Sequence, residues 1–345
     1  MSGIAAYGVY IPSSRIKIED IALTWGKNPQ EIEGALKVKE KSVPSFDEDT
    51  ITIAVQSGSR ALAMGNIAAK NIQAVFVGSE SHPYAVNPSA TIVGEFLGIG
   101  PHYFASDLEF ACKAGTTGMQ MVYGLLESKK IQLGMAIGAD TAQAQPRDIL
   151  EYTAASAGAA YILSNKQSES IADIVTTSSY CSDTPDFWRR DGQKHPSHAG
   201  RFSGEPAYFT HIMGEAKRLF AETKSKPSDY AYCIFHMPNG KFPRVVAKKL
   251  GFTDAQLQPS LTVDLIGNPY CAAAFVGLAA VLDIAKPHEK IFFVSYGSGA
   301  GADGFIFETT KNISLKKKKN QSVLEQIEKK HYISYIEYLK QTKQL

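Results

Sequence analysis

Two pairs of polar residues stand at the same spacing in the two halves of the chain. Glu80 lies 32 residues before Cys112, and His236 lies 32 residues before Asn268. The first member of each pair follows a short apolar run typical of a buried strand, at residues 72–78 and 230–235. Features matched at one fixed offset are typical of a duplicated folding unit. We therefore expect two similar halves that bring these four side chains together.

The remaining pattern favours an α/β fold built from such halves. Apolar runs of strand length match between the halves, 131–138 with 291–296 and 158–163 with 301–307, and a first strand is expected at 3–10. Stretches that read as helices alternate with these runs, at 17–38, 49–64, 89–97, 112–130, 243–250 and 268–285. Residues 180–208 are polar with little periodicity, and a connection of that length is usually a functional insertion.

Composition is that of an ordinary globular protein. Apolar residues make up 44% and charged residues 20%. The 4 cysteines lie far apart without a C-x-x-C pair, which argues against a zinc site or a disulfide framework and fits a reducing cytoplasm. The longest apolar run, 271–282, is too short to cross a bilayer. Residues 4–12 lack the basic leader and long apolar core of a signal peptide. We expect a cytoplasmic protein without a membrane span.

Cys112 is where catalytic chemistry is most strongly indicated. Small residues follow it, and apolar residues then recur at helical spacing from Met119 onward, so the thiol is expected where a helix begins. Backbone N–H groups and the helix dipole at such a site favour the thiolate. An isolated cysteine is more often a small buried hydrophobe, and an isolated Glu80 is more often a surface carboxylate. Their place in the repeat favours a nucleophile and a base.

Five ordered motifs carry a resemblance to a known superfamily. They are S-E-S after the strand at 72–78, F-A-C-K-A-G, F-H-M-P-N-G-K-F-P, G-N-P-Y and Y-G-S-G-A-G-A-D-G. In this order they resemble the thiolase superfamily, and within it the archaeal hydroxymethylglutaryl-CoA synthases. The resemblance implies a thiolase-like fold, layered α/β/α/β/α, with two βαβ-rich halves related by a pseudo-dyad. The chain departs from the family at Pro269 and Cys271, where hydroxyl-bearing residues are expected.

The repeat and the resemblance divide the chain into three parts. Residues 1–170 form an N-terminal half with the nucleophile and the glutamate. Residues 171–310 form a C-terminal half with the histidine and the asparagine, and they include the polar insertion 180–208. Residues 311–345 form a basic, aromatic-rich tail with a net charge of +6. Because the net charge of the whole chain is +2, residues 1–310 carry a net charge of −4.

The resemblance implies an acyltransferase that forms a carbon–carbon bond. Cys112 would attack acetyl-CoA and hold the acetyl group, and Glu80 would remove a proton from the acetyl methyl. His236 would stabilise and protonate the oxyanion that forms when the enolate attacks acetoacetyl-CoA. Water would then release 3-hydroxy-3-methylglutaryl-CoA, a reaction of the mevalonate pathway of isoprenoid synthesis. Coenzyme A thioesters are the substrates, and neither a cofactor nor a metal is expected.

Further residues match positions that contact substrate in the family. Those expected at the acyl and thioester groups are Thr153, Ser203, Asn268 and Ser298. From chemistry alone, the Asn268 amide suits a positioning role, since it hydrogen-bonds without titrating, and the glycine run around Ser298 offers backbone N–H groups. Basic residues are expected at the phosphates of coenzyme A, and the matching positions are Arg201, Lys241 and Arg244.

Partners follow from the same resemblance. It implies a homodimer and a complex with an acetoacetyl-CoA thiolase and a small zinc-ribbon/OB-fold protein. Nucleic-acid binding is not expected, because the body is net acidic. The four-lysine run 316–319 is typical of a solvated linker or an interaction arm. The apolar stripe that follows it, 323–339, either packs back on the body or docks on another protein.

Three other functions stay open at the level of the sequence. A β-ketoacyl-ACP synthase III-like condensing enzyme uses Cys, His and Asn and has no need of Glu80, so this glutamate discriminates between the two. A nitrilase-like amidase would add Lys113 or Lys241 to Cys112 and Glu80, in one compact site without duplication. A non-catalytic acyl-CoA-binding subunit would leave Cys112 unacylated.

Overall fold

The computed structural model describes residues 2–141, 144–299, 301–316 and 321–345, and in them one strand order occurs twice. In the first half β4 is parallel to β6, β6 is antiparallel to β7, and β7 is antiparallel to β1. In the second half β11, β12, β13 and β8 repeat these directions. β5 adds a parallel strand beside β4. The strands are β1 (Gly3–Tyr10), β4 (Ala74–Gly78), β5 (Phe104–Leu108), β6 (Leu133–Asp140), β7 (Ala157–Ser164), β8 (Ala172–Cys181), β11 (Tyr232–Phe235), β12 (Lys290–Val294) and β13 (Gly301–Thr309).

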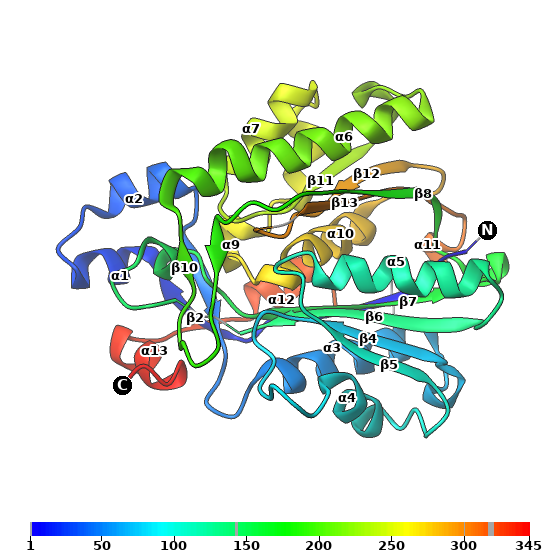
Figure 1. The fold of residues 1–345 in the computed structure, drawn as a ribbon, viewed down its shortest axis with the longest axis horizontal. Coiled ribbons are helices and arrows are strands. Elements are labelled where there is room, and N and C mark those ends of the chain that lie inside the picture. Colours follow the sequence, from blue (N-terminus) through cyan, green and yellow to red (C-terminus); the bar gives the residue numbers. More distant parts are fainter. Residues whose placement is uncertain (1, 142–143, 300, 317–320) are drawn as a thin grey trace.

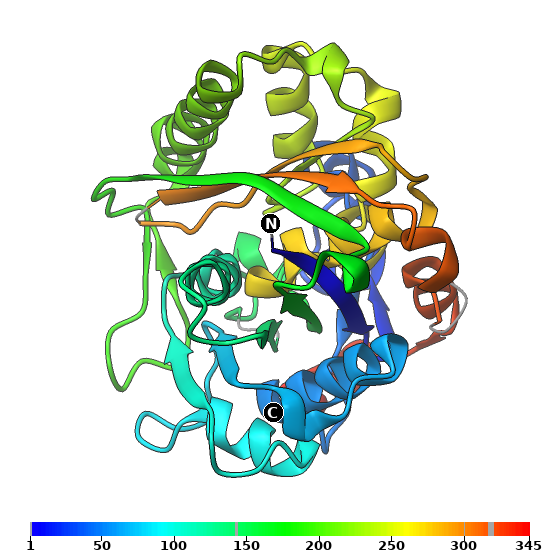
Figure 2. The same ribbon diagram turned by 90° about the vertical axis from the view of Figure 1, so that its right-hand side faces the viewer.

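The two sets of strands lie in alternating layers with helices. β1 and β8 pair briefly, which gives one continuous order, β11-β12-β13-β8-β1-β7-β6-β4-β5. Figure 1 shows α5 and α10 between the two sets, α6 and α7 outside the upper set, and α3 and α4 outside the lower one. In Figure 2 the green β8 and the orange β13 run side by side. The α/β architecture of two similar halves agrees with the predicted fold class.

Five of the six predicted helices are present, with ends within five residues of the predicted positions: α3 (Thr50–Gly65), α4 (Ser89–Leu97), α5 (Ala114–Glu127), α7 (Lys241–Leu250) and α10 (Ala273–Ile284). The sequence analysis did not predict the helices α6 (Phe209–Thr223), α8 (Asp254–Leu257), α9 (Val263–Ile266) and α11 (Ile313–Lys316). The single helix predicted at 17–38 is wrong, because α1 (Ile18–Thr24) and α2 (Pro29–Leu36) replace it. The side chain of Asn28 accepts from the backbone of Gln30, and the proline after Asn28 suits the first helical position, so a new helix starts there.

The polar stretch 180–208 carries more regular structure than its sequence indicates. It contains the end of β8 and a short hairpin of β9 (Phe187–Trp188) and β10 (Ser197–His198). Asp186 anchors this hairpin, since its side chain accepts from the hydroxyl of Tyr296 at 3.1 Å and its carbonyl accepts from the hydroxyl of Ser203 at 2.9 Å. Among the described helices, none is long and apolar enough to cross a membrane.

The tail packs back on the body, the first of its two predicted arrangements. β14 (His331–Tyr332) pairs in parallel with β2 (Ser14–Lys17), which is antiparallel to β3 (Glu40–Val43). α12 (Val323–Glu328) buries an apolar face in one hydrophobic cluster, and α13 (Tyr335–Gln341) buries Tyr338 in another; both clusters contain residues of the two halves. Residues 317–319 of the lysine run lie outside the described residues.

Candidate active site

A strand end and a helix start meet at the nucleophile. β4 ends at Gly78, two residues before Glu80, and Cys112 lies two residues before α5. α5 packs so closely on the strand that a side-chain carbon at Gly78 would lie 2.2 Å from the backbone nitrogen of Gly115. Ala111 takes a φ of 43°, a conformation that non-glycine residues rarely adopt outside functional turns. This turn leaves Cys112 facing Glu80.

The Cys112 thiol and the Glu80 carboxylate are in direct contact. Cys112 Sγ donates to Glu80 Oε1 at 2.7 Å, and Cys112 is only 6% exposed. Burial, followed by the charge of Asp140, raises the pKa of Glu80 to about 8. Burial and the Glu80 charge also raise the pKa of Cys112 above its ordinary value. The pair therefore stays protonated at neutral pH and releases its first proton under mildly alkaline conditions.

This state of the sulfur corrects the prediction of a thiolate. Lys113, and not Cys112, is the residue that caps α5, so the thiol lies ahead of the helix. Negative charge on Glu80 and Asp140 and a second buried thiol, Cys271, all act on Cys112. Such neighbours favour the neutral thiol over the thiolate. The geometry instead makes Glu80 the acceptor for the thiol proton.

Asp140 fixes both sides of this corner, although the sequence analysis did not select it. Its Oδ1 accepts from the backbone N–H of Glu80 at 2.8 Å, and from the hydroxyls of Ser79 and Ser81 at 2.7 and 2.6 Å. Its Oδ2 accepts from the backbone N–H of Cys271 at 2.9 Å. The available signal was its place at the end of an apolar run, since β6 ends on Asp140 as β4 ends just before Glu80.

A mostly apolar cavity of about 400 Å³ opens beside the nucleophile. The predicted site residues that line it are Cys112, Thr153, Arg201, Ser203, His236, Asn268 and Ser298. Glu80 joins this group through its contact with Cys112. A cavity of this size with a few convergent polar groups is typical of a small-molecule site.

His236 follows β11 as Glu80 follows β4. Its ring is buried, which lowers the pKa of His236 to about 3, so the imidazole is neutral at pH 7. The Tyr208 hydroxyl donates to the backbone carbonyl of His236 at 2.7 Å. The ring Nδ1 has no hydrogen-bond partner among the described residues. The residue lines the cavity, so an N–H of this neutral imidazole can act on a substrate oxygen bound there.

Asn268 stands at the turn before α10, the counterpart of the nucleophile corner. Its Oδ1 accepts from the backbone of Tyr270 at 2.9 Å, and its own backbone N–H donates to the carbonyl of Thr153 at 2.7 Å. The two residues are therefore held together as one wall of the cavity. With the Oδ1 bonded within the turn, the amide NH₂ is the group of Asn268 that can donate to a substrate.

Two of the basic residues predicted to contact coenzyme A do not line the cavity. Lys241 is exposed at the first residue of α7, beside Asn239 and Phe242, which do line it. Arg244 is engaged elsewhere, because its two terminal nitrogens donate to Asp264 at 3.0 and 2.5 Å. Its position does not support the predicted contact with coenzyme A phosphates.

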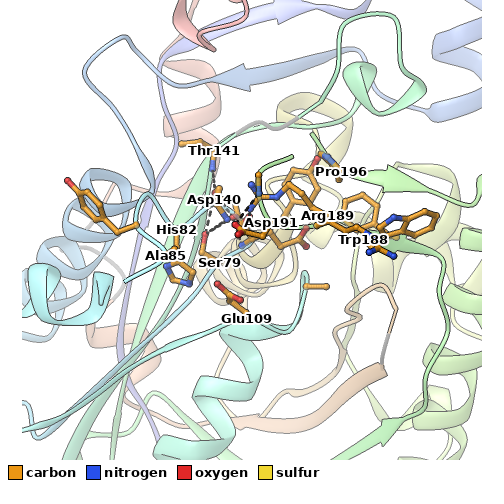
Figure 3. A pocket seen from close by; sticks show the side chains of 18 residues that line it. Ser79, His82, Ala85, Glu109, Asp140, Thr141, Trp188, Arg189, Asp191 and Pro196 are labelled. Carbon is orange, nitrogen blue, oxygen red and sulfur yellow. Dashed lines mark hydrogen bonds between the residues drawn. The ribbon is translucent and has the colours of Figure 1, made fainter. Parts of the chain in front are cut away.

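A second, polar cavity of about 530 Å³ lies against Glu80. Figure 3 shows its wall, with His82 and Glu109 on one side of Asp140 and the hairpin residues Trp188 and Arg189 on the other. Arg189 donates from Nη2 to the backbone carbonyl of Glu80 at 3.0 Å. Sequence reasoning missed this wall because the hairpin is more than a hundred residues from β4 in the chain. Glu80 thus stands between a polar cavity and the nucleophile.

Solved structures share this fold over nearly the whole chain. MvaS in complex with 3-hydroxy-3-methylglutaryl coenzyme A aligns with a TM-score of 0.90 at 23% identity, covering 99% of this chain and 91% of that chain. 3-Oxoacyl-(acyl carrier protein) synthase III from Pseudomonas aeruginosa PAO1 aligns with a TM-score of 0.80 at 16% identity, covering 90% and 98%. These alignments give the chain the thiolase-like fold.

Curated relatives narrow this class. No protein-family model matches the chain. Hydroxymethylglutaryl-CoA synthase of Methanobrevibacter smithii is 53% identical over 340 residues, covering 99% of this chain and 98% of the relative. That of Methanocaldococcus jannaschii is 53% identical over 345 residues, covering 100% and 99%. The chain belongs to the hydroxymethylglutaryl-CoA synthase family. The predicted family, the thiolase-like fold and the enzyme class, a carbon–carbon bond-forming acyltransferase, are confirmed.

Proposed function

We propose that this enzyme condenses acetyl-CoA with acetoacetyl-CoA and water to give 3-hydroxy-3-methylglutaryl-CoA and free coenzyme A. The relatives' name supports this reaction and implies the mevalonate pathway. The observation that carries the proposal is the 2.7 Å contact of Cys112 Sγ with Glu80 Oε1, beside the cavity that His236 lines. An acyl-holding nucleophile and a base within reach of the same acyl group are what the reaction requires.

The first half of the reaction loads the nucleophile. In the fraction of molecules in which Glu80 is ionised, Glu80 takes the thiol proton, and Cys112 Sγ attacks the thioester carbonyl of acetyl-CoA. The bond to the coenzyme A sulfur breaks, and that sulfur leaves with the proton that Glu80 held. Because the pKa of Glu80 is raised to about 8, the carboxyl group can both accept and return this proton near neutral pH.

The second half forms the carbon–carbon bond. Glu80 removes a methyl proton from acetyl-Cys112, and the enolate carbon attacks the ketone carbon of acetoacetyl-CoA. His236, held neutral by burial, donates an N–H to the oxygen that becomes negative, a contribution typically worth about a hundredfold to a thousandfold in rate. The proton on Glu80 returns to that oxygen. Water then attacks the thioester, and Cys112 leaves as a thiol with a proton from the water.

The cavity lining suggests how the substrates are held. We assign Asn268, Thr153, Ser203 and Ser298 to the acyl and thioester groups, since each lines the cavity beside Cys112. Arg201 lines the same cavity and is exposed, which suits a contact with coenzyme A phosphates. We also assign Lys241 to a contact with coenzyme A phosphates at the mouth of the cavity, because its neighbours Asn239 and Phe242 line that cavity.

Assembly and location belong to the same proposal. β5 ends the large sheet, and exposed aromatic residues lie on it and on the adjoining α4, with Phe104 54% and Phe96 74% exposed. A second copy docked at this edge would cover them, as a homodimer requires. A molar mass measured by sedimentation that equals the mass of a single chain would contradict the homodimer. We also propose that the enzyme is cytoplasmic and works with an acetoacetyl-CoA thiolase and a zinc-ribbon/OB-fold protein. Its chain is divided into two halves and a tail, with boundaries at about residues 170 and 310.

The alternatives receive less support from the geometry. A ketoacyl-synthase-like enzyme would have no role for Glu80, yet this glutamate contacts the nucleophile Cys112 directly. Lys113 could not complete an amidase triad, because its Nζ pairs with Asp303 at 3.0 Å in the interior and does not line the cavity. Lys241 is exposed and also outside the lining.

The intact mass of the protein after incubation with acetyl-CoA tests the proposal. Cys112 should gain one acetyl group, and Cys112→Ala should gain none. Glu80→Ala should still accept some acetyl yet lose condensation by roughly a hundredfold to ten-thousandfold, because Glu80 is the carboxylate in contact with Cys112 Sγ. Cys181→Ser is the matched control, since it removes an exposed thiol and should leave both readouts unchanged. Product formed by Glu80→Ala at the normal rate would favour the ketoacyl-synthase-like alternative, and an unacylated Cys112 would favour a binding subunit.

A further inference from the structure

The C-terminal segment 331–344 docks along the side of the molecule that carries the substrate cavity. Ile333 donates its backbone N–H to the carbonyl of Arg15 at 2.9 Å, and Ser334 caps α13. Tyr338 on that helix is 1% exposed. In Figure 1 the red α13 lies at the same end of the molecule as the hairpin of β10. Lys194 of that hairpin donates to the carbonyl of Lys343.

A buried carboxylate receives the first contact from this segment. The Tyr335 hydroxyl donates to Glu151 Oε1 at 2.7 Å. Glu151 Oε2 accepts from Trp25 Nε1 at 2.9 Å and from the backbone N–H of Arg147 at 2.8 Å. Glu151 is fully buried, so these donors together satisfy a charge that water does not reach. One of them belongs to the tail.

A buried lysine receives the second contact. Lys41 Nζ donates to the Tyr338 hydroxyl at 3.1 Å and also to the backbone carbonyl of Glu151. Lys41 Nζ lies 4.4 Å from the centre of the Tyr338 ring, a cation–π contact when the amine is charged, and burial lowers the pKa of Lys41 to about 7. Lys41 is fully buried, so α13 supplies two of its stabilising contacts. Tyr335 therefore contacts the side chain of Glu151 directly, and Tyr338 acts on the backbone of Glu151 through Lys41.

A third contact reaches the surroundings of the nucleophile. The side-chain amide of Gln344 donates to the carbonyl of Ala144 at 2.8 Å. Ala144 packs in one buried cluster with Cys112, Ala154 and Tyr270. The last helix of the chain and the residues after it thus contact residues next to the active-site wall at two separate places.

Residues close to Glu151 in the chain line the substrate cavity. Glu151 belongs to the single turn η2 (Ile149–Tyr152), and Leu150 of that turn and Thr153 line the cavity. Thr153 accepts the backbone N–H of Asn268 at 2.7 Å, so a shift of η2 moves that amide as well. Misplacement of a positioning group by about 1 Å can cost roughly a hundredfold in rate.

From these contacts we propose that α13 and the residues after it, 335–344, position the Thr153–Asn268 wall of the substrate cavity, acting through Tyr335 and Tyr338 on Glu151 and Lys41. Tyr335 and Tyr338 are positioning residues in this account, since neither lines the cavity. The inference rests on the proposed condensation and extends it, because it makes the tail part of the enzyme's active-site architecture.

The test removes only the two hydroxyl groups, in the full-length chain. In the double variant Tyr335→Phe/Tyr338→Phe both rings stay, so the core packing is kept. We expect kcat for condensation to fall at least tenfold per acetylated Cys112, with the acetylated fraction measured by intact mass. Dividing the measured rate by the acetylated fraction corrects for any loss of folded protein. A merely structural role of the two hydroxyl groups would lower only the amount of folded protein.

Tyr332→Phe is the matched control. It removes a tail hydroxyl that donates to Glu40 Oε2 at 2.6 Å on β3, away from the cavity lining. This variant should keep kcat within about twofold of wild type. An unchanged kcat in the double variant, or an equal fall in the control, overturns the inference while the wild-type activity still supports the proposed reaction. A wild-type chain that acetylates or condenses nothing overturns both.

Discussion

At the scale of single residues, the site depends on two acidic groups that share one contact. A thiol and a carboxylate at 2.7 Å in a buried corner cannot both carry charge without strong repulsion. Burial therefore holds the pair in its protonated form, and the raised pKa of Glu80 makes this residue the group that titrates near the working pH. The same burial holds His236 neutral as a hydrogen-bond donor. Acid and base roles thus follow from desolvation more than from residue type.

The raised pKa of Glu80 predicts a pH dependence of stability. Between the unfolded value, near 4.5, and about 8, the folded chain binds the Glu80 proton more tightly than the unfolded chain does. Its contribution to stability is therefore present at low pH and is lost as pH rises through about 8. Glu80→Gln removes the titration, so the variant should become more stable than wild type as pH increases, by up to a few kcal/mol.

Urea unfolding at a series of pH values between 5 and 9 measures this difference. Glu109→Gln is the matched control, since it removes an exposed carboxylate from the wall of the polar cavity beside Glu80. A stability difference between wild type and Glu80→Gln that stays constant across that range would show that the folded pKa of Glu80 is ordinary.

At the scale of secondary structure elements, close backbone packing sets the position of the nucleophile. α5 lies against β4 where Gly78 meets Gly115, and the turn at Cys271 lies against β6 where a side-chain carbon at Gly138 would come within 2.5 Å of the Cys271 carbonyl. Both close approaches are made on strands of the first half, one by the corner of Cys112 and one by the corner of Asn268. A side chain at either glycine would push a catalytic corner away from the strand on which it packs.

Gly78→Ala should therefore impair both stability and acylation. The new methyl group would lie 2.2 Å from the backbone nitrogen of Gly115, so α5 must move. We expect a loss of roughly 1–3 kcal/mol in urea unfolding, as for other overpacked cores. Acetylation of Cys112 should slow at least tenfold, because the helix start moves with the thiol.

Gly34→Ala is the matched control, since Gly34 lies in α2 with no atom within 4 Å of an added side-chain carbon. It should leave the rate unchanged and stabilise the helix slightly. Wild-type acetylation in Gly78→Ala would mean that the corner does not depend on this contact.

At the scale of the whole molecule, the sequence predicted what its repeat encodes. The matched offsets of Glu80 with Cys112 and of His236 with Asn268 anticipated the duplicated strand order, because a strand end and a helix start are local features. Contacts between distant segments left no local signal. Tertiary packing determines the pairing of Arg244 with Asp264, the docking of the tail and the hairpin wall beside Glu80. The break between α1 and α2 at Asn28 does have a local signal, Pro29, which the prediction of a single helix did not use.

One buried ion pair connects the two halves at the nucleophile corner. Lys113 Nζ donates to Asp303 Oδ1 at 3.0 Å, and the same carboxylate accepts from Thr116 at 2.9 Å and from Ser179 at 2.8 Å. Lys113→Met leaves the Asp303 charge buried without its cation, so we expect a loss of about 3–5 kcal/mol in urea unfolding. Asp303→Asn in the same chain should restore part of that loss, because it removes the unpaired charge. Arg218→Met, which breaks an exposed pair with Glu222, should change little. A Lys113→Met chain as stable as wild type would show that the halves are held together by their apolar core alone.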